Sequence, residues 1–252
     1  MVAPFSNYAS QMKITDYDGK MEKEFFSYGE NFRGGVNIAA GDINGDGVDE
    51  IITGAGAGGG PHVRIFDSSG KVLGQFFAYD KNFRGGVNVA AGDVNGDGKD
   101  EIIVGAGVGG GPHVRIFNSA GAIEGQFFAY DRNFRGGVRV ATADIDGGVA
   151  QKKDEIITAP GLGGGPHIRI FDNHANLFGQ FFAYDKSFHG GVSIAAGDID
   201  NDGLAEIITG AGPGGTPHVR VFETDGKLIG SFYAYEDKFS GGVSVGAVGI
   251  KN

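Results

Sequence analysis

Four acidic loops contain the residues of this chain that are best suited to bind a hard cation. Oxygen-bearing side chains stand at positions one, three and five of a loop, with glycine at position six and glutamate at position nine. Ca²⁺ takes carboxylate and amide oxygens from such a loop, together with the backbone carbonyl at position seven. Mg²⁺ prefers to keep several waters, so we predict calcium. The predicted ligands are, in chain order, Asp42, Asn44, Asp46, Val48 and Glu50; Asp93, Asn95, Asp97, Lys99 and Glu101; Asp144, Asp146 and Glu155; and Asp198, Asp200, Asp202, Leu204 and Glu206.

These loops differ from the EF-hand loop after position nine. An EF-hand needs glutamate at position 12 and a helix after it. Position 12 is Thr53, Val104 or Thr209 here, and a strand-like run follows. We therefore expect the glutamate at position nine to complete the ligand set within a β-hairpin. The alternative is an ordinary acidic turn without metal, because Asp, Asn and Gly also build turns.

The third loop departs from the pattern of the other three. It is longer by three residues, and Gly148 takes the place of the aspartate at position five. Lys152 and Lys153 add positive charge close to the remaining acids. The sequence leaves open whether this loop binds a metal ion, so it predicts three calcium ions with a possible fourth at residues 144–155.

The acidic loops belong to a unit of 51 residues that is repeated along the chain. Residues 31–81 and 82–132 are identical at 40 of 51 positions without a gap. Within one unit we predict four short strands, at residues 35–41, 50–54, 62–67 and 71–79. No segment has helical periodicity. Four antiparallel strands in about 50 residues are typical of a β-propeller blade.

Counting the units predicts an all-β, five-bladed β-propeller that forms one domain over residues 1–252. The chain ends on a first strand with no partner, whereas its start resembles the later strands of a blade. We expect these two pieces to combine and close the ring, since an open solenoid would need capping repeats. The predicted blades are residues 34–81, 85–132, 136–186 and 190–237, and a fifth made from 241–252 plus 1–30.

The repeated unit resembles the FG-GAP repeat family, which includes the blades of the integrin α-subunit head. The resemblance rests on the acidic loop, on Gly54-Ala55-Gly56 or Ala159-Pro160-Gly161 after the second strand, and on the His-Val-Arg-Ile-Phe strand. It implies calcium bound between the first two strands of a blade and an extracellular setting. Integrin heads have seven blades, whereas five are expected here, and the Phe-Gly of the family name reads Phe32-Arg33-Gly34.

Composition narrows the classes of partner. The formal charge of −10 disfavours nucleic acid and anionic membranes. No apolar run is long enough for a membrane span, and the first ten residues lack the features of a signal peptide. Cysteine is absent, so we expect bound metal rather than disulfides to stabilise the fold. The predicted location is extracellular or at the cell surface, as a monomer or as part of a larger surface protein.

Two further repeated patterns have competing interpretations. The His-x-Arg pair, as in His62 and Arg64, is interpreted as a polar contact between blades, and a ring of ligand-binding cations is the alternative. The aromatic run after it predicts packing between blades. Tyrosine with a nearby arginine could instead form a repeated glycan site. That alternative would use Tyr79, Tyr130, Tyr184 and Tyr235 with Arg33, Arg84 and Arg135.

The sequence contains no complete catalytic or nucleotide-binding pattern. Gly54-x-Gly56-x-x-Gly59 matches a dinucleotide fingerprint, but Pro61 and a strand follow where a helix is required. No nucleophile–base pair or pair of acids is brought together by spacing. We therefore predict that the chain is not an enzyme. The expected function is a calcium-stabilised, non-catalytic binding or scaffolding module for an unidentified protein or glycan, with a lectin as the alternative.

Overall fold

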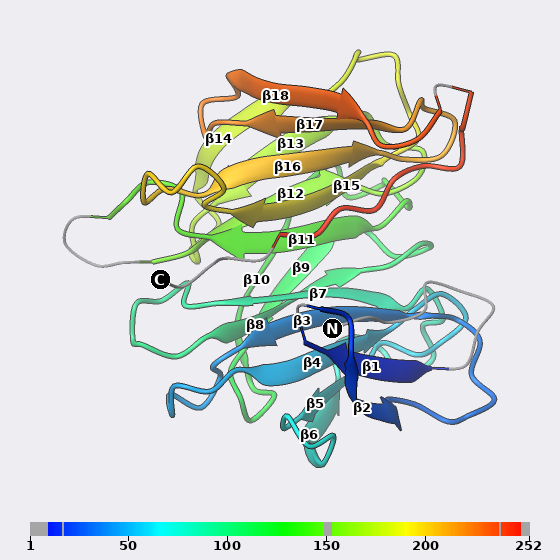
Figure 1. Ribbon diagram of the computed structural model, residues 1–252, viewed down its shortest axis with the longest axis vertical. Helices are drawn as coiled ribbons and strands as arrows, with labels where there is room; N and C mark the ends of the chain where they lie inside the picture. Colours follow the sequence, from blue (N-terminus) through cyan, green and yellow to red (C-terminus); the bar gives the residue numbers. More distant parts are fainter. Residues whose placement is uncertain (1–9, 17, 149–152, 237, 248–252) are drawn as a thin grey trace.

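A computed structural model of the chain describes residues 10–16, 18–148, 153–236 and 238–247, and the elements in these ranges are β-strands (Figure 1). Four four-stranded antiparallel sheets follow one another in sequence. They contain β3 (Val36–Gly41), β4 (Glu50–Ala55), β5 (His62–Phe66) and β6 (Val72–Phe77); β7 (Val87–Gly92), β8 (Glu101–Ala106), β9 (His113–Phe117) and β10 (Ile123–Phe128); β11 (Val138–Ala143), β12 (Glu155–Pro160), β13 (His167–Phe171) and β14 (Leu177–Phe182); and β15 (Val192–Gly197), β16 (Glu206–Ala211), β17 (His218–Phe222) and β18 (Leu228–Tyr233).

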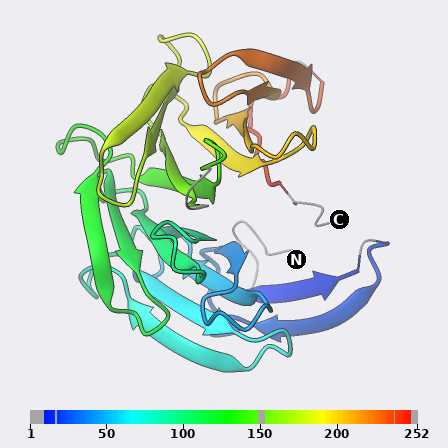
Figure 2. The ribbon, with the colours of Figure 1, turned by 90° about the vertical axis from the view of Figure 1, so that its left-hand side faces the viewer.

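The predicted blade is confirmed strand by strand. In every sheet the strands are paired in sequence order, so each sheet is one up-and-down blade. The second strand of the first blade, β4, is buried along its whole length, whereas β6 at the outer edge is largely exposed. Figure 2 shows the blades following one another around an arc. The first strands of successive blades, β3, β7, β11 and β15, contact one another and form the inner wall. Among the described residues, no helix is long and apolar enough to cross a membrane.

The fifth blade is seen only in part, which corrects the prediction of a closed five-bladed ring. Before the first complete blade lies a two-stranded sheet of β1 (Gln11–Thr15) and β2 (Met21–Phe26). Residues 241–247 form no assigned strand, and the described residues show no pairing between them and β1. Residues 1–4, which resemble the second-strand residues 157–160 and would have to join the two, lie outside the described residues. The structure therefore shows four complete blades plus a partial one.

Aromatic and aliphatic side chains fill the space between neighbouring blades. Phe76 on β6 packs against Phe117 on β9 of the next blade, with ring centroids 4.6 Å apart. Ile102 and Ile103 on β8 are both fully buried, on opposite faces of their sheet. Burying one such side chain contributes about 1.5–3 kcal/mol, and a tilted aromatic pair adds roughly 0.5–1.5 kcal/mol. Repetition of these contacts from blade to blade holds the arc together.

The tyrosine after each outer strand ties its blade to the next one. Tyr130 Oη lies 2.9 Å from the carbonyl oxygen of Thr158 and 2.7 Å from that of His167. Burial raises the pKa of the corresponding Tyr184 to about 12, so the hydroxyl stays protonated and can donate. Tyr79 makes the same contacts in the second blade. These hydroxyls are therefore engaged within the fold, which removes three of the four tyrosines from the glycan site considered above.

The arginine of the His-x-Arg pair serves the same interface. Arg115 Nη1 donates a hydrogen bond of 2.7 Å to the carbonyl of Ala78 in the preceding blade, and its guanidinium lies 5.0 Å from the Tyr79 ring centroid. His113 stacks on Phe128 within its own blade, with ring centroids 4.6 Å apart. The interpretation of the pair as a contact between blades is confirmed, since the His113 ring also packs against Tyr79 of the preceding blade, with ring centroids 5.5 Å apart.

Replacing Tyr130 with phenylalanine is expected to destabilise the fold by about 1–3 kcal/mol, because two buried carbonyl groups lose a donor. Tyr235→Phe is the matched control, since Tyr235 is 61% exposed. Chemical denaturation of both variants at fixed calcium measures the difference. Equal stability of the two variants would show that the hydroxyl of Tyr130 contributes nothing to the contact between blades.

Candidate calcium-binding loops

Each acidic loop connects the inner strand of a blade with the buried second strand. The register pairs the last residue of the inner strand with the loop's glutamate, as Gly41 pairs with Glu50. This glutamate is the first residue of the second strand, so its carboxyl group lies at the base of the loop. All four glutamates are buried: Glu50 is 5% exposed, Glu101 3%, Glu155 6% and Glu206 1%. Buried carboxylates need partners, so the base of every loop calls for a cation or a set of donors.

The aspartate at position one organises the loop. In the first loop, Asp42 accepts hydrogen bonds from the backbone N–H groups of Gly45, Asp46 and Gly47 at 2.7, 3.1 and 2.7 Å. Gly45 and Gly47 have φ angles of 80° and 85°, which bend the chain around the carboxylate. Burial acts to raise the pKa of Asp42, but these backbone donors outweigh it and hold the pKa below the usual value. Asp42 is therefore a fixed anion at the mouth of the loop.

Positions three and nine face each other in the first loop. Asn44 Nδ2 donates a 2.7 Å hydrogen bond to Glu50 Oε1. The other carboxylate oxygen, Glu50 Oε2, is buried and has no hydrogen-bond partner among the described residues. An orphaned buried oxygen on an acidic side chain costs free energy. A cation bound beside it would supply the missing partner, so the donor set of this loop fits calcium.

The raised pKa values of the four glutamates fit a site that binds a cation. Burial, followed by repulsion from Glu124 and Asp97, raises the pKa of Glu101 to about 7. Burial is also the largest cause for Glu155, with Asp146 and Asp144 adding to it, and raises its pKa to about 7. The same cause raises the pKa of the other two glutamates, Glu50 and Glu206. A divalent cation would stabilise the ionised forms and reverse this penalty.

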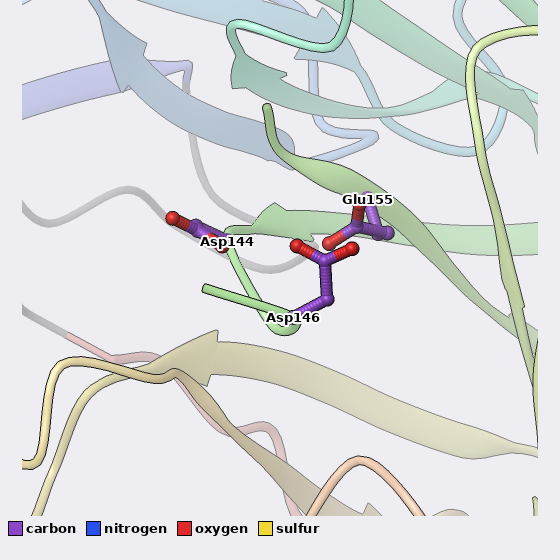
Figure 3. A group of neighbouring side chains, drawn as sticks. All are labelled: Asp144, Asp146 and Glu155. Atoms are coloured by element: carbon purple, nitrogen blue, oxygen red, sulfur yellow. The ribbon is translucent and has the colours of Figure 1, made fainter. Parts of the chain in front are cut away.

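Figure 3 shows the three acids of the third loop as neighbours, with Asp146 and Glu155 facing each other and Asp144 beside them. One oxygen each from Asp144, Asp146 and Glu155 lies within 4.8 Å of the others. The fourth loop forms an equivalent group from Asp198, Asp200 and Glu206. Loops one and two have asparagine at position three, which leaves two carboxylates in the corresponding places. The third loop, which the sequence left open, thus brings its three predicted ligands near one another, between the end of β11 and the start of β12.

Positions five and seven shape the outer part of the loops. The carboxylate at position five accepts a hydrogen bond from the amide at position seven, as Asp46 does from Val48 at 2.9 Å, Asp97 from Lys99 at 3.0 Å and Asp202 from Leu204 at 2.9 Å. This contact fixes the turn from which the carbonyl at position seven is predicted to bind metal. The structure places Val48 in solvent, with 58% of its surface exposed, so its side chain has no role in the core.

Sequence reasoning missed the side chains that cover each loop from the next blade. A Cβ at Gly45 in the first loop would lie 3.2 Å from Cε and Cγ of Lys99 in the second. Lys153 covers Gly96 in the same way, and Leu204 covers Gly147. Lys153 immediately precedes Asp154 just as Lys99 precedes Asp100, so it takes position seven in the longer third loop. That spacing was the sequence signal for its place.

Neighbouring loops are also joined through the aspartate at position eight. Asp100 N–H donates to the Asp42 carbonyl at 3.0 Å, and Asp42 N–H donates to the Asp100 carboxylate at 2.9 Å. The backbone link recurs from Asp154 to Asp93 at 3.0 Å and from Ala205 to Asp144 at 3.0 Å. The four loops therefore form a hydrogen-bonded series along the arc. The repeated Asp-Glu pair in the sequence was the signal for this contact.

Comparison with known proteins finds the same repeat in part of this chain. The FG-GAP repeat model matches residues 34–73, 85–123 and 190–226, which hold loops one, two and four. The chain is 27% identical over 183 residues to integrin alpha pat-2 of Caenorhabditis elegans, a match that covers 70% of this chain and 12% of the integrin subunit. The resemblance seen in the sequence is confirmed. The third blade, whose acidic loop is longer, falls outside the matched segments.

Solved structures share the fold at low identity. The rhamnogalacturonan lyase YesW superimposes with a TM-score of 0.51 at 16% identity, over 90% of this chain and 46% of the lyase. The Dos1 propeller gives a TM-score of 0.51 at 14% identity, over 92% of this chain and 54% of that one. The chain thus spans about half the length of each of these proteins.

The lyase corrects the prediction that the chain is not an enzyme. That prediction was based on the lack of paired catalytic groups in repeated sequence, but an enzyme shares the fold. Reactive groups can be placed on loops of a propeller without disturbing its repeats, so this fold does not argue against catalysis. At 16% identity the likeness does not assign the lyase's chemistry either. The repeated loops and the comparison agree that three of the four complete blades match the FG-GAP repeat model.

Proposed function

We propose that this chain is a calcium-stabilised β-propeller that serves as a binding or scaffolding module outside the cell. The single observation that carries the proposal is the buried Glu50 Oε2, which has no partner among the described residues at the base of an otherwise ordered acidic loop. The strand, the acidic turn and the buried glutamate recur in the other blades, where the glutamate accepts a backbone N–H at 3.2 Å (Glu101), 3.1 Å (Glu155) or 2.8 Å (Glu206). Millimolar extracellular calcium can fill loops of modest affinity. The FG-GAP match and the likeness to an integrin subunit support this setting.

Within a loop, each residue has a distinct part in holding the ion. Asp42 is already fixed by three backbone N–H groups and offers its charge at little further entropic cost. Glu50 would bind from below, and Asn44 would turn its amide oxygen toward the ion in place of its present hydrogen bond to Glu50. Calcium would supply the charge that makes the buried glutamate favourable. Because the loops are joined from blade to blade, filling one loop stabilises its neighbour.

The proposed partner is a protein or a glycan at the cell surface, bound by a monomer or by this module within a larger surface protein. Arraying extracellular proteins and glycans against labelled protein, in calcium and in chelator, tests this part of the proposal. A signal that depends on calcium is expected. Silence of the whole array in calcium, with the protein folded, would count against the binding role while leaving the calcium loops intact.

We further propose that the ring closes as a fifth blade. Residues 241–247 lie beside β15 and β16 as an inner strand does elsewhere, since a Cβ at Gly210 would meet the Val243 carbonyl just as one at Gly54 would meet that of Val87. At the other end, Phe25 of β2 packs on Phe66 with ring centroids 4.9 Å apart, as Phe76 packs on Phe117. Both halves of the fifth blade therefore dock like the repeated ones.

Deleting residues 241–252 is expected to lower the melting temperature and to cause self-association. The deletion removes the bond from Val243 N–H to the Ala211 carbonyl and leaves the partial blade without an inner strand. Light scattering coupled to gel filtration, together with a thermal melt, measures both effects. A truncated protein as monomeric and heat-stable as the parent would refute the closure.

A further inference from the structure

A cavity of about 400 Å³ lies where the inner strands begin, at the opposite end from the acidic loops. The second residue of each inner strand lines it, together with the equivalent residue of the C-terminal segment. In chain order these residues are Asn37, Asn88, Arg139, Ser193 and Ser244. The surrounding wall is made mainly of glycine and valine, with Ala57, Leu162 and Pro213. The repeat thus presents one polar position per blade to the cavity, and only one of the five carries a charge.

Most of these polar side chains bridge to the next blade. Asn37 Nδ2 donates to the Val87 carbonyl at 2.7 Å, and Asn88 Nδ2 donates to the Val138 carbonyl at 2.8 Å. Ser193 Oγ accepts a hydrogen bond of 3.1 Å from Val245 N–H. The two asparagine contacts are equivalent in position, whereas Ser193 accepts from a residue two places further along, and all three give the side chain a structural role. They leave the side-chain oxygens of Asn37 and Asn88 free of any donor among the described residues.

Arg139 is the exception in this series. The described residues give it neither a hydrogen bond nor a salt bridge, although burial is strong enough to lower its pKa. A guanidinium carries five N–H donors and stays protonated in proteins. Asp144, at the far end of the same strand, is five residues away, or about 17 Å. The cavity therefore contains a half-buried cation with unused donors.

We infer that this cavity is a binding site for a small hydroxylated carboxylate, a ligand of the sugar-acid class, with Arg139 as the residue that recognises the carboxylate. A guanidinium binds a carboxylate through two parallel hydrogen bonds, which gives both strength and orientation. The free oxygens of Asn37 and Asn88 accept hydrogen bonds from hydroxyl groups of such a ligand. The cavity volume is at the small end of ligand pockets, which run from roughly 300 to 1,000 Å³, so it suits a single sugar unit.

This inference names a ligand for the binding module proposed above and rests on that proposal. The test uses the full chain in saturating calcium, with glucuronate as the probe and glucose as its uncharged counterpart. Arg139→Asn installs the residue that Asn37 and Asn88 provide in other blades, so the variant should fold and bridge to the next blade. Lys71→Ala is the control, since Lys71 is an exposed cation outside the cavity and alanine occupies the equivalent place at Ala122. Calorimetric titration gives the affinities, and a thermal melt shows that each variant is folded.

Glucuronate should bind saturably, and glucose at least tenfold more weakly. Arg139→Asn should weaken glucuronate roughly 10- to 100-fold, as expected for a lost charged hydrogen-bonding partner, and should melt at or above the temperature of the parent. Lys71→Ala should bind within twofold of the parent. Equal binding by Arg139→Asn and the parent would overturn the inference, and so would phosphate or sulfate binding without glucuronate. If no probe binds while calcium binding is intact, the site fails and the calcium-stabilised module stands.

Discussion

Removing calcium is expected to lower the melting temperature of this protein more than any single substitution. A loop filled at 1,000 times its dissociation constant adds about 4 kcal/mol to the folded state. For a domain of this size, 4 kcal/mol corresponds to a shift of about 8–16 °C. The predicted ligands repeat in four loops, and hydrogen bonds from Asp100, Asp154 and Ala205 join each loop to the one before it. Stripping all of the ions would therefore weaken the contacts between blades as well as the loops themselves.

A thermal melt of chelated protein titrated with Ca²⁺, and separately with Mg²⁺, measures this effect. Calcium should restore the melting temperature at lower concentration than magnesium, because magnesium dehydrates reluctantly and demands octahedral geometry. A melting temperature that neither ion changes would mean that the acidic loops are ordinary turns. The proposed extracellular role would then lose its main support.

Replacing Glu101 with glutamine is expected to change stability in opposite directions with and without calcium. In calcium, loss of one ligand charge should weaken that loop by about 10–100-fold, or roughly 1.4–2.7 kcal/mol. In chelator, the ionised carboxylate of Glu101 destabilises the folded state, because burial and its acidic neighbours raise its pKa to about 7 from 4.5. The carboxyl group loses its proton near pH 4.5 in the unfolded chain and near pH 7 in the folded chain. The loss of folding stability caused by this group is therefore absent below pH 4.5 and complete above pH 7. Glutamine removes the penalty, so the chelated variant should be more stable than the parent by about 1–3 kcal/mol at pH 8.

Chemical denaturation at pH 8 and pH 4, with calcium or chelator, tests the sign change. The advantage of Glu101→Gln in chelator should vanish at pH 4, where the parent carboxyl is protonated in both states. Glu236→Gln is the control, because Glu236 is exposed and lies outside the loops. A variant that is destabilised equally in calcium and in chelator would show that Glu101 has a packing role only.

The sequence predicted the blade well because local patterns determine it. Strands such as β4 (Glu50–Ala55) and β5 (His62–Phe66) were placed to within one residue, since the turns between them have clear glycine and aspartate signals. Ring closure depends instead on contacts between the two ends of the chain. No local pattern fixes whether the segment after Gly241 pairs with the start of the chain, and the described residues show the fifth blade only in part.

The site was predictable in its ligands and not in its surroundings. Position in the repeat identified Asp42, Asn44 and Glu50 as one group, and the structure brings them together. The contacts of Asp100 with the preceding loop depend on how one blade packs on the next, which a single repeat does not encode. Arg139 was overlooked because the equivalent residues of the other repeats gave no sign of a ligand site. In the structure, Arg139 lines a cavity. The prediction that the chain is not an enzyme was wrong for a similar reason. The lack of paired catalytic groups in the repeated sequence was taken to exclude catalysis, which loops outside the repeat pattern could provide.

Elemental analysis of purified, buffer-exchanged protein tests the central claim most directly, because it counts bound calcium without assuming any effect on stability. The repeated loop sequences predict three ions per chain in loops one, two and four, or four ions if the group formed by Asp144, Asp146 and Glu155 is also filled. The Asp42→Ala variant should hold one ion fewer. A chain that retains no calcium from a millimolar solution, or a variant that holds as many ions as its parent, would contradict the assignment of these loops.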